Sequence, residues 1–220
     1  MNLPKTSQEE QEERKQQTLA AYDKIATQFS ETRTENFWAP EFATYKTLIP
    51  GTDVLDVGCG SERDANMFTE AGFSYTGIDA SPEMIKVCNE RAKGGKFLVM
   101  DFGELQFPDS SFDGVWAAAS LLHVPKAQVG GVLTELKRVL RPGGVGFISL
   151  KEKKDIDEGV VTETTYGGIS RFFAFYTKDE FAKILTDEGF EILQIQEHPE
   201  LKRPVNWLCY FFRAQKDSSL

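Results

Sequence analysis

The sequence has few of the residues from which metal sites and disulfide frameworks are built. Its 220 residues include two histidines and three cysteines. Cys59, Cys88 and Cys209 lie far apart and among apolar neighbours, so we interpret them as buried free thiols of a reducing compartment. His123 and His198 have no second histidine or cysteine at ligand spacing. We therefore expect neither a zinc site nor a disulfide-stapled fold.

Long apolar runs and excess positive charge are also lacking. No run is long enough to cross a bilayer, and the polar start of the chain lacks the apolar segment of a signal peptide. The formal net charge is -9. An acidic chain is repelled at long range by nucleic acid and by anionic membranes. We therefore predict a cytoplasmic protein that binds neither nucleic acid nor membrane, while the oligomeric state stays open.

The chain does contain a regular alternation of short apolar runs and amphipathic segments. The alternation implies a parallel sheet covered by helices on both faces, and the two final strands, with no helix between them, should pair antiparallel. We predict a Rossmann-like, doubly wound α/β fold with a seven-stranded, mostly parallel sheet and an antiparallel last strand. The strands are expected at 53–57, 74–78, 97–100, 112–118, 145–150, 190–197 and 205–213, and the helices at 62–71, 81–94, 128–140 and 177–188.

Two segments fall outside this alternation. Residues 1–50 show helical spacing from about Ser7, where Ser7 and Glu10 fit a capping box, and a second short helix before Pro50. Residues 151–176 are rich in glycine, threonine and aromatic residues and fit neither period. We therefore divide the chain into an N-terminal helical cap, 1–50, and a Rossmann-like domain, 51–220, in which 151–176 form an insertion or lid.

The loop after the first predicted strand has the features of a nucleoside site. Gly58-Cys59-Gly60 connects that strand to a helix, and Asp79 ends the second strand. Ligands of such sheets bind at the carboxyl ends of the strands, where glycines permit close approach and a carboxylate suits ribose hydroxyls. A tight turn without a ligand is the alternative, and the register of Asp79 favours the nucleoside.

The residues after this loop distinguish between two nucleoside cofactors. The dinucleotide fingerprint requires a third glycine, and Arg63 occupies its place. Glu62 and Asp64 make the start of the helix partly acidic, which disfavours a pyrophosphate but suits a cationic sulfonium. The pattern therefore favours S-adenosylmethionine over a nicotinamide cofactor.

Further segments then resemble the motifs of one family, in the family's order. Residues 55–60 resemble the first motif of class I methyltransferases and 77–84 the second, followed by similar stretches at 107–113, 122–124 and 140–144. The resemblance covers about residues 53–150 and implies a small-molecule type of S-adenosylmethionine-dependent methyltransferase. The sequence does not identify the methyl acceptor of such an enzyme. A protein that binds S-adenosylmethionine without catalysis and, with less support, an NAD-dependent oxidoreductase are the alternatives.

The resemblance also implies roles for individual positions. The glycine loop would lie against the methionine moiety, the second strand would end at the ribose, and the third at the adenine. Arg63 would either support the cofactor carboxylate or form an ion pair at the start of its helix. The predicted cofactor-binding residues are Asp56, Gly58, Cys59, Gly60, Arg63, Asp79, Ala80, Met84, Asp101, Phe102, Ala117 and Ala118.

The acceptor side is defined more weakly. Methyl transfer is an in-line displacement, for which orientation alone can supply about 7–11 kcal/mol, so a general base is not obligatory. His123 is the candidate catalytic base because histidine titrates near neutrality; alternatively it lines the cofactor pocket or caps its loop. His198 is predicted on the surface. The predicted substrate-binding residues, each of which could instead be structural, are Tyr22, Trp38, Tyr166, Arg171 and Tyr176.

Overall fold

The structure is a computed structural model that describes residues 7–32, 36–200 and 205–215. A seven-stranded sheet crosses the molecule in the order β3-β2-β1-β4-β5-β9-β8. Neighbours from β3 to β5 pair parallel, whereas β9 pairs antiparallel with both β5 and β8. The predicted fold class is confirmed. The strands are β1 (Asp53–Val57), β2 (Ser74–Asp79), β3 (Lys96–Val99), β4 (Phe112–Ala118), β5 (Leu140–Lys151), β8 (Phe190–Glu200) and β9 (Val205–Ala214).

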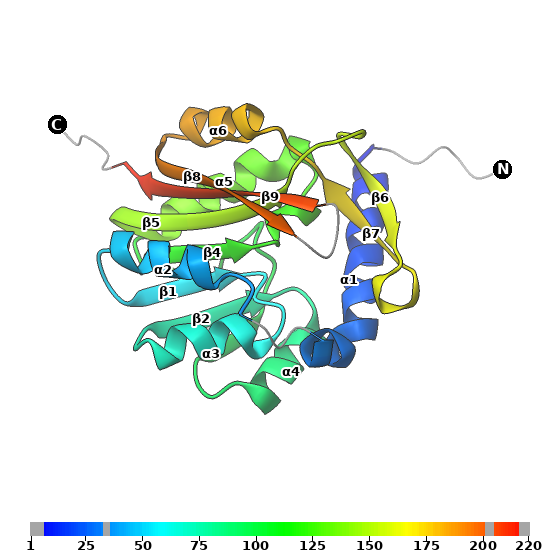
Figure 1. Ribbon diagram of the computed structural model, residues 1–220, viewed down its shortest axis with the longest axis horizontal. Coiled ribbons are helices and arrows are strands. Elements are labelled where there is room, and N and C mark those ends of the chain that lie inside the picture. The colour runs from blue at the N-terminus through cyan, green and yellow to red at the C-terminus, as the bar shows by residue number, and fades with distance from the viewer. Residues whose placement is uncertain (1–6, 33–35, 201–204, 216–220) are drawn as a thin grey trace.

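Helices cover both faces of this sheet, with α2 and α3 in front of it and α5 behind it in the view of Figure 1. Local signals set several of their ends. The Ser81 hydroxyl accepts a hydrogen bond from the Met84 amide at 3.1 Å, and Thr177 and Glu180 form a capping box. The Ser7 side chain, predicted to cap the first helix, lies outside the described residues. The helices are α1 (Ser7–Thr32), α2 (Ala39–Leu48), α3 (Glu62–Glu70), α4 (Pro82–Arg91), α5 (Val129–Val139) and α6 (Lys178–Asp187).

The two N-terminal helices lie against different parts of the sheet. Tyr45 of α2 is fully buried, and its hydroxyl lies 3.2 Å from the carbonyl oxygens of Val115 and Val145. A Cβ at Gly114 would come within 2.1 Å of that hydroxyl, so the sheet needs a glycine where α2 packs on it. Helix α1 instead stands beyond the carboxyl ends of the strands (Figure 1), as a cover over that edge.

The segment after β5 is more regular than the sequence indicated. It contains a β-hairpin of β6 (Glu158–Glu163) and β7 (Ile169–Ala174), which forms a separate two-stranded sheet beside α1 (Figure 1). Its turn places Tyr166, Gly167 and Gly168 at positive φ, which glycine adopts readily. Short β-branched and aromatic runs favour these strands, but charged and glycine residues between them hide the period.

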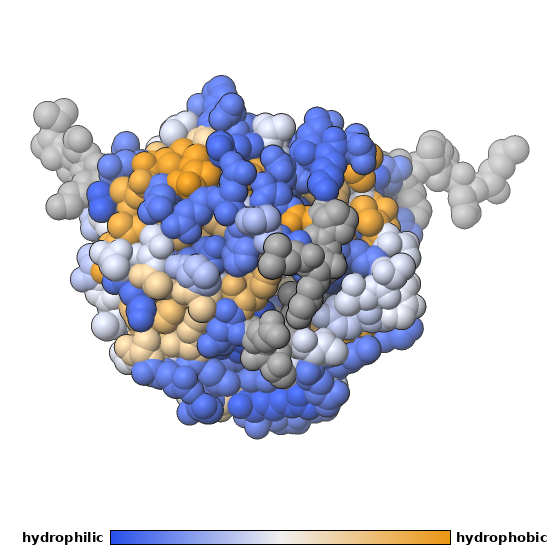
Figure 2. Space-filling view, viewed as in Figure 1, coloured by the Kyte–Doolittle hydropathy of each residue, from blue (hydrophilic) through white to orange (hydrophobic). Residues whose placement is uncertain are grey.

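The face shown in Figure 2 is mixed in polarity. Figure 2 shows hydrophilic residues over much of one face, with apolar patches between them. Among the described residues, Val99, Ile156 and Val160 are the large hydrophobic side chains that are exposed. No described helix combines the length and the apolar character needed to cross a membrane.

Candidate cofactor and acceptor site

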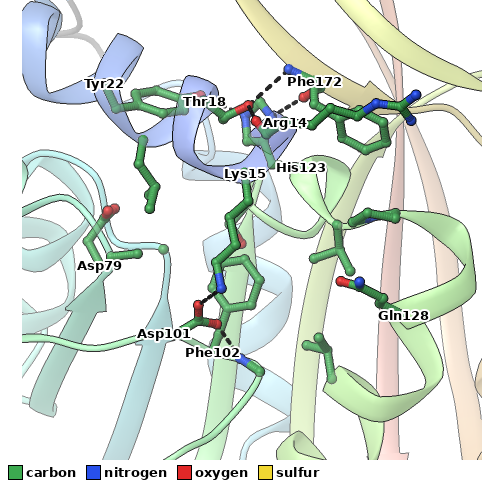
Figure 3. Close-up of a pocket in the computed structure, with 18 of the residues that line it drawn as sticks. Arg14, Lys15, Thr18, Tyr22, Asp79, Asp101, Phe102, His123, Gln128 and Phe172 are labelled. Atoms are coloured by element: carbon green, nitrogen blue, oxygen red, sulfur yellow. Dashed lines mark hydrogen bonds and ion pairs between the residues drawn. The ribbon is translucent and has the colours of Figure 1, made fainter. Parts of the chain in front are cut away.

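A cavity of about 510 Å³ lies at the carboxyl edge of the sheet, beneath α1. The loops after β1, β2 and β4 contribute Gly58, Asp79 and Ser120 to its wall, while α1 and β7 contribute Tyr22 and Phe172. Figure 3 shows α1 above the cavity and side chains reaching into it from several elements. This volume is in the range of small-molecule sites, and its place is the one expected for a ligand of a parallel sheet.

The loop after β1 requires its glycines. Gly58 has φ 73° and Gly60 has φ 59°, in the left-handed region. A Cβ at Gly58 would lie 2.5 Å from the Cβ of Ser120, so a side chain there would push the two cavity loops apart. The amides of Gly58 and Cys59 both donate to the Ile78 carbonyl, at 2.8 and 2.9 Å, which ties the loop to the end of β2.

Asp79 is fixed by the backbone around it. One carboxylate oxygen accepts from the Gly60 amide at 3.0 Å, and the other accepts from the Ser81 amide at 2.9 Å. Burial raises the pKa of Asp79 to about 6, against the lowering effect of these hydrogen bonds. A carboxylate has further lone pairs on each oxygen, so Asp79 can still accept from two ligand hydroxyls. This arrangement fits a ribose diol.

Asp101 and Phe102 form the next part of the wall. One oxygen of Asp101 accepts from the Gly103 amide at 2.7 Å, and the other forms an ion pair with Lys15 of α1. In Figure 3 the Phe102 ring lies beside this pair, below α1. A carboxylate next to an aromatic wall suits the amino group and ring of adenine. Together with Asp79 and the glycine loop, these residues fit an adenosine-containing cofactor.

The opposite part of the cavity is organised by a hydrogen-bond chain. The Tyr22 hydroxyl lies 2.7 Å from Nε2 of His123, and Nδ1 of His123 lies 2.6 Å from the Phe172 carbonyl oxygen. Because a carbonyl only accepts, Nδ1 carries the proton and Nε2 accepts from Tyr22. Burial, together with the nearby cations Arg171 and Lys151, lowers the pKa of His123 to about 3. The imidazole is therefore neutral at physiological pH.

Arg171 lies behind Tyr22, away from the cavity wall. Its Nη1 donates to the Tyr22 hydroxyl at 2.8 Å, and its Nη2 forms an ion pair with Glu163. Lys151 also binds Glu163, at 2.7 Å. Arg171, predicted as a substrate-binding residue, does not line the cavity, because Tyr22 and the hairpin enclose its guanidinium.

The cavity brings together much of the predicted site. The members that line it come from α1, from the loops after β1 to β3 and from the turn after β4. They are Tyr22, Gly58, Gly60, Asp79, Ala80, Asp101, Phe102 and His123.

Several predicted cofactor residues lie behind this wall instead. Asp56 is buried under the glycine loop, where it accepts from the Tyr75 hydroxyl at 2.5 Å; burial, then the nearby Asp64, raise its pKa well above the ordinary value. Arg63 pairs with Asp64 at 2.6 Å. Of the two roles considered for Arg63, the ion pair is the one present, although it is buried rather than solvated.

Packing explains the other cofactor positions that miss the cavity. Cys59 packs with Ile85 and Cys88, and Met84 packs with Ala26 and Val87. Ala117 and Ala118 stay within β4, and the wall is formed two residues later by Ser120.

The predicted aromatic acceptor residues outside the wall pack against other aromatic rings. Trp38 is buried, with its ring 6.0 Å from Phe147 and 5.3 Å from Trp207. Tyr176 is buried with its ring 5.0 Å from Phe181. Tyr166 lies in the hairpin turn, 5.9 Å from the ring of Phe29.

His198, predicted on the surface, is partly buried. Its Nδ1 lies 2.8 Å from a carboxylate oxygen of the buried Glu41, and its ring stacks on Phe37 with centroids 4.4 Å apart. The pair connects β8 to α2, away from the cavity. Among the described residues, no group of three or more His, Cys, Asp or Glu side chains is placed to hold a metal ion.

Helix α1 supplies wall residues that sequence reasoning missed. Gln11, Lys15 and Thr18 line the cavity beside Tyr22, which the sequence did predict. Thr18 accepts from the Phe172 amide at 3.0 Å, and Gln11 accepts from the Gln128 side chain at 2.7 Å. Their spacing of three and four positions puts them on one face of a helix, which is the signal that could have identified them.

Comparison with known proteins supports this interpretation of the core. Residues 55–148 match the family described as "Methyltransferase domain". The 2-methyl-6-phytyl-1,4-hydroquinone methyltransferase of Synechocystis sp. is 40% identical over 50% of this chain and 35% of its own length. The 27-O-demethylrifamycin SV methyltransferase of Amycolatopsis mediterranei is 34% identical over 71% of this chain and 60% of its own length. The matched region thus spans less than two thirds of either relative.

The fold comparison extends over nearly the whole chain. A Burkholderia thailandensis 1,6-didemethyltoxoflavin-N1-methyltransferase, solved with 1,6-didemethyltoxoflavin and S-adenosylhomocysteine, superposes with a TM-score of 0.78. It is 22% identical, and the match covers 98% of this chain and 94% of that one. At this identity the likeness shows a shared fold, and residues 55–148 of the chain are similar to the methyltransferase domain family.

Proposed function

We propose that this protein transfers a methyl group from S-adenosylmethionine to a small, largely apolar acceptor. The observation that carries the proposal is one continuous cavity with two different walls. One wall has the glycine loop, Asp79 and Asp101, and the other has Val124, Val132 and further apolar side chains. A nucleoside cofactor and a second, less polar molecule can therefore share the same enclosed space.

The roles of the cofactor wall follow from its donors and acceptors. We assign Asp79 to the ribose hydroxyls, Asp101 and Phe102 to the adenine, and the Gly58 to Gly60 loop to the methionine portion. When bound, the cofactor supplies an activated methyl group on a sulfonium. The chain's own residues then orient the acceptor and exclude water, which is where much of the rate enhancement of a displacement originates.

The acceptor wall, by which we mean the part of the cavity around Tyr22, His123 and Phe172, supports a positioning role for His123. A neutral imidazole whose pKa is about 3 has little tendency to take a proton, so it is a weak general base at neutral pH. Its Nε2 instead holds the Tyr22 hydroxyl in one orientation. We propose that Tyr22, which lines the cavity, contacts the acceptor and that His123 acts through it.

The names of the relatives agree with a small acceptor. These names refer to a phytyl hydroquinone, a rifamycin and a didemethyltoxoflavin. An acceptor with a ring would suit the part of the cavity that Phe172 lines. The identity of the atom that receives the methyl group is left to experiment.

Calorimetry tests the cofactor assignment directly. S-adenosylmethionine and S-adenosylhomocysteine should bind to the purified chain, whereas NAD should not. Binding of NAD alone would overturn the proposal in favour of an oxidoreductase. A panel of phenols, hydroquinones and heterocycles, followed by mass spectrometry for a gain of one methyl group, tests transfer. Cofactor binding without transfer to any member would favour a non-catalytic binding protein.

A further inference from the structure

The hydrogen-bond chain at the acceptor wall continues into the β6–β7 hairpin. Arg171 on β7 donates to Tyr22 on α1 at 2.8 Å, and Glu163 on β6 pairs with Arg171. Arg171 pairs across the hairpin with Val161, so Glu163 is its diagonal neighbour on the same face. An ion pair within the hairpin therefore contacts Tyr22 of the cavity wall, which lies 149 positions from Arg171 in the sequence.

The two ends of this hydrogen-bond chain fix the direction in which each of its hydrogen bonds is donated. A guanidinium can only donate, so the Tyr22 oxygen must accept from Arg171 and direct its single proton to His123. At the other end the Phe172 carbonyl can only accept, which places the remaining imidazole proton on Nδ1. With both ends fixed, a single hydroxyl rotamer of Tyr22 and a single tautomer of His123 satisfy every bond.

We propose that Arg171 and Glu163 are positioning residues of the acceptor site, which act by holding Tyr22 and His123 in this one arrangement. The inference rests on the proposed function, because it assigns Tyr22 to the acceptor wall. The ion pair does not contact the cavity, so neither residue touches the acceptor.

The cost of this arrangement supports a role beyond folding. The side chain of Arg171 is 4% exposed, and its Nε has no hydrogen-bond partner among the described residues. Buried ion pairs are often no more stabilising than apolar residues of the same size, and an unpaired buried N–H is unfavourable. An apolar side chain at this position would close the hairpin against α1 more simply but could not donate to Tyr22.

The test follows His123 by nuclear magnetic resonance, because the chain has only two histidines to assign. The wild type should show the neutral Nδ1–H tautomer from about pH 5 to 8. Arg171→Met removes both the donor to Tyr22 and a cation that lowers the pKa of His123. We expect the His123 pKa to rise by about 1 unit or more and the tautomers to mix. The other groups that face the imidazole, Tyr22, Lys151 and Glu163, are not substituted in this variant.

A matched control comes from the same hairpin. Ser170 is the neighbour of Arg171, and its hydroxyl bonds to that of Thr162 at 2.7 Å on an exposed face. Ser170→Ala removes this cross-strand bond and should leave the His123 titration and tautomer unchanged. Arg171→Lys, which keeps a cation, should restore the low pKa in part.

Glu163→Gln keeps the proposal testable if Arg171→Met does not fold. The variant keeps the shape of Glu163 but leaves Arg171 without its ion-pair partner, so Tyr22 should lose its single orientation and the tautomers should mix. Folded variants in which the pKa and tautomer of His123 are those of the wild type would overturn the proposal. The ion pair would then only stabilise the hairpin. Failure of S-adenosylhomocysteine to bind the wild type is a separate result, which would count against the proposed function.

Discussion

The two walls of the cavity are built on opposite principles. The cofactor wall is made by short stretches of chain that close on themselves, as when Asp79 accepts from the amides of Gly60 and Ser81. The acceptor wall is made by side chains that meet from distant elements, as when Tyr22 of α1 bonds to His123, 101 positions away. Backbone amides define the first wall and side-chain ends define the second.

This difference separates the wall that binds the constant ligand from the wall whose side chains can change with the acceptor. Backbone geometry binds the part of a ligand that never changes, and it needs only glycines and one carboxylate at defined places. Side chains on a covering helix and hairpin can be exchanged without disturbing the sheet, so they suit the part of the reaction that differs between acceptors. The comparison predicts that the cofactor wall fails through single local changes, whereas the acceptor wall depends on remote partners.

Gly58→Ala should have the largest effect on the cofactor wall. The new Cβ would meet Ser120 at 2.5 Å in a left-handed residue, so the loop has to move. We expect S-adenosylhomocysteine affinity to fall about 100-fold in calorimetry. Gly72→Ala is the matched control, because Gly72 has φ 87° but no atom within 4 Å of the place that a Cβ would take. Affinities equal to that of the wild type in both variants would show that the contact with Ser120 does not limit cofactor binding.

Asp79→Ala should have the next largest effect. Loss of the ribose contact is expected to cost about 1–3 kcal/mol of binding free energy, which calorimetry with S-adenosylhomocysteine will measure. Stability should also fall somewhat, because the Gly60 and Ser81 amides lose their acceptor. Asp79→Asn, which keeps one acceptor oxygen, serves as the conservative comparison. An affinity equal to that of the wild type would remove Asp79 from the cofactor site.

The two walls should respond to pH with opposite sign. The folded-state pKa of His123 is about 3, below its ordinary value of 6.5, so its contribution to stability is complete above about pH 6.5 and falls on acidification. The folded-state pKa of Asp79 is about 6, above its ordinary value of 3.8, so its contribution is complete below about pH 4 and is lost as the pH rises through 6.

Urea unfolding of the cofactor-free protein between about pH 4 and 7 measures this difference. His123→Gln should remove a slope of up to about 1.4 kcal/mol per pH unit that favours the folded state as pH rises. Asp79→Asn should remove a slope of the other sign. Parallel curves for both variants and the wild type would show that neither group is buried in the ionisation state described.

Lys15→Met should have the smallest effect on stability and the most informative effect on binding. The Lys15–Asp101 pair is partly exposed, with 46% and 37% of the two side chains accessible, so its loss should change the unfolding free energy by less than about 1 kcal/mol. Removing Lys15 leaves Asp101 free for a ligand amino group. We expect S-adenosylhomocysteine to associate about two- to fivefold faster in stopped-flow fluorescence, where a slower rate would show that Lys15 helps the ligand to bind.

The same contrast explains how far the sequence could be interpreted. The glycine loop, the Asp79 position and the Ser81 cap are local patterns whose geometry follows from a few consecutive residues. The mostly parallel sheet followed because alternating strands and helices leave few arrangements. The predicted cofactor positions that do not line the cavity, such as Met84 and Ala117, pack in the core beside it, and a motif does not specify the direction of a side chain.

The acceptor wall could not be derived in the same way. An aromatic residue such as Trp38 or Tyr176 has the same local pattern in a core as in a pocket, and only tertiary packing decides between them. Arg171 was recognised as unusual, but its partner Tyr22 lies on another element, so its role could not be inferred from spacing. The hairpin escaped detection because its strands are short and interrupted by charges.

The contacts between α1 and β7 also help the protein to avoid self-association. An edge strand exposes backbone groups that can recruit a strand from another molecule. On β7 the Phe172 amide is bonded to Thr18 and the Phe172 carbonyl to His123, at 3.0 and 2.6 Å. The middle of this edge is therefore closed to a foreign strand by side chains from a helix and a turn. Substitutions at Thr18 should be judged by self-association as well as by turnover.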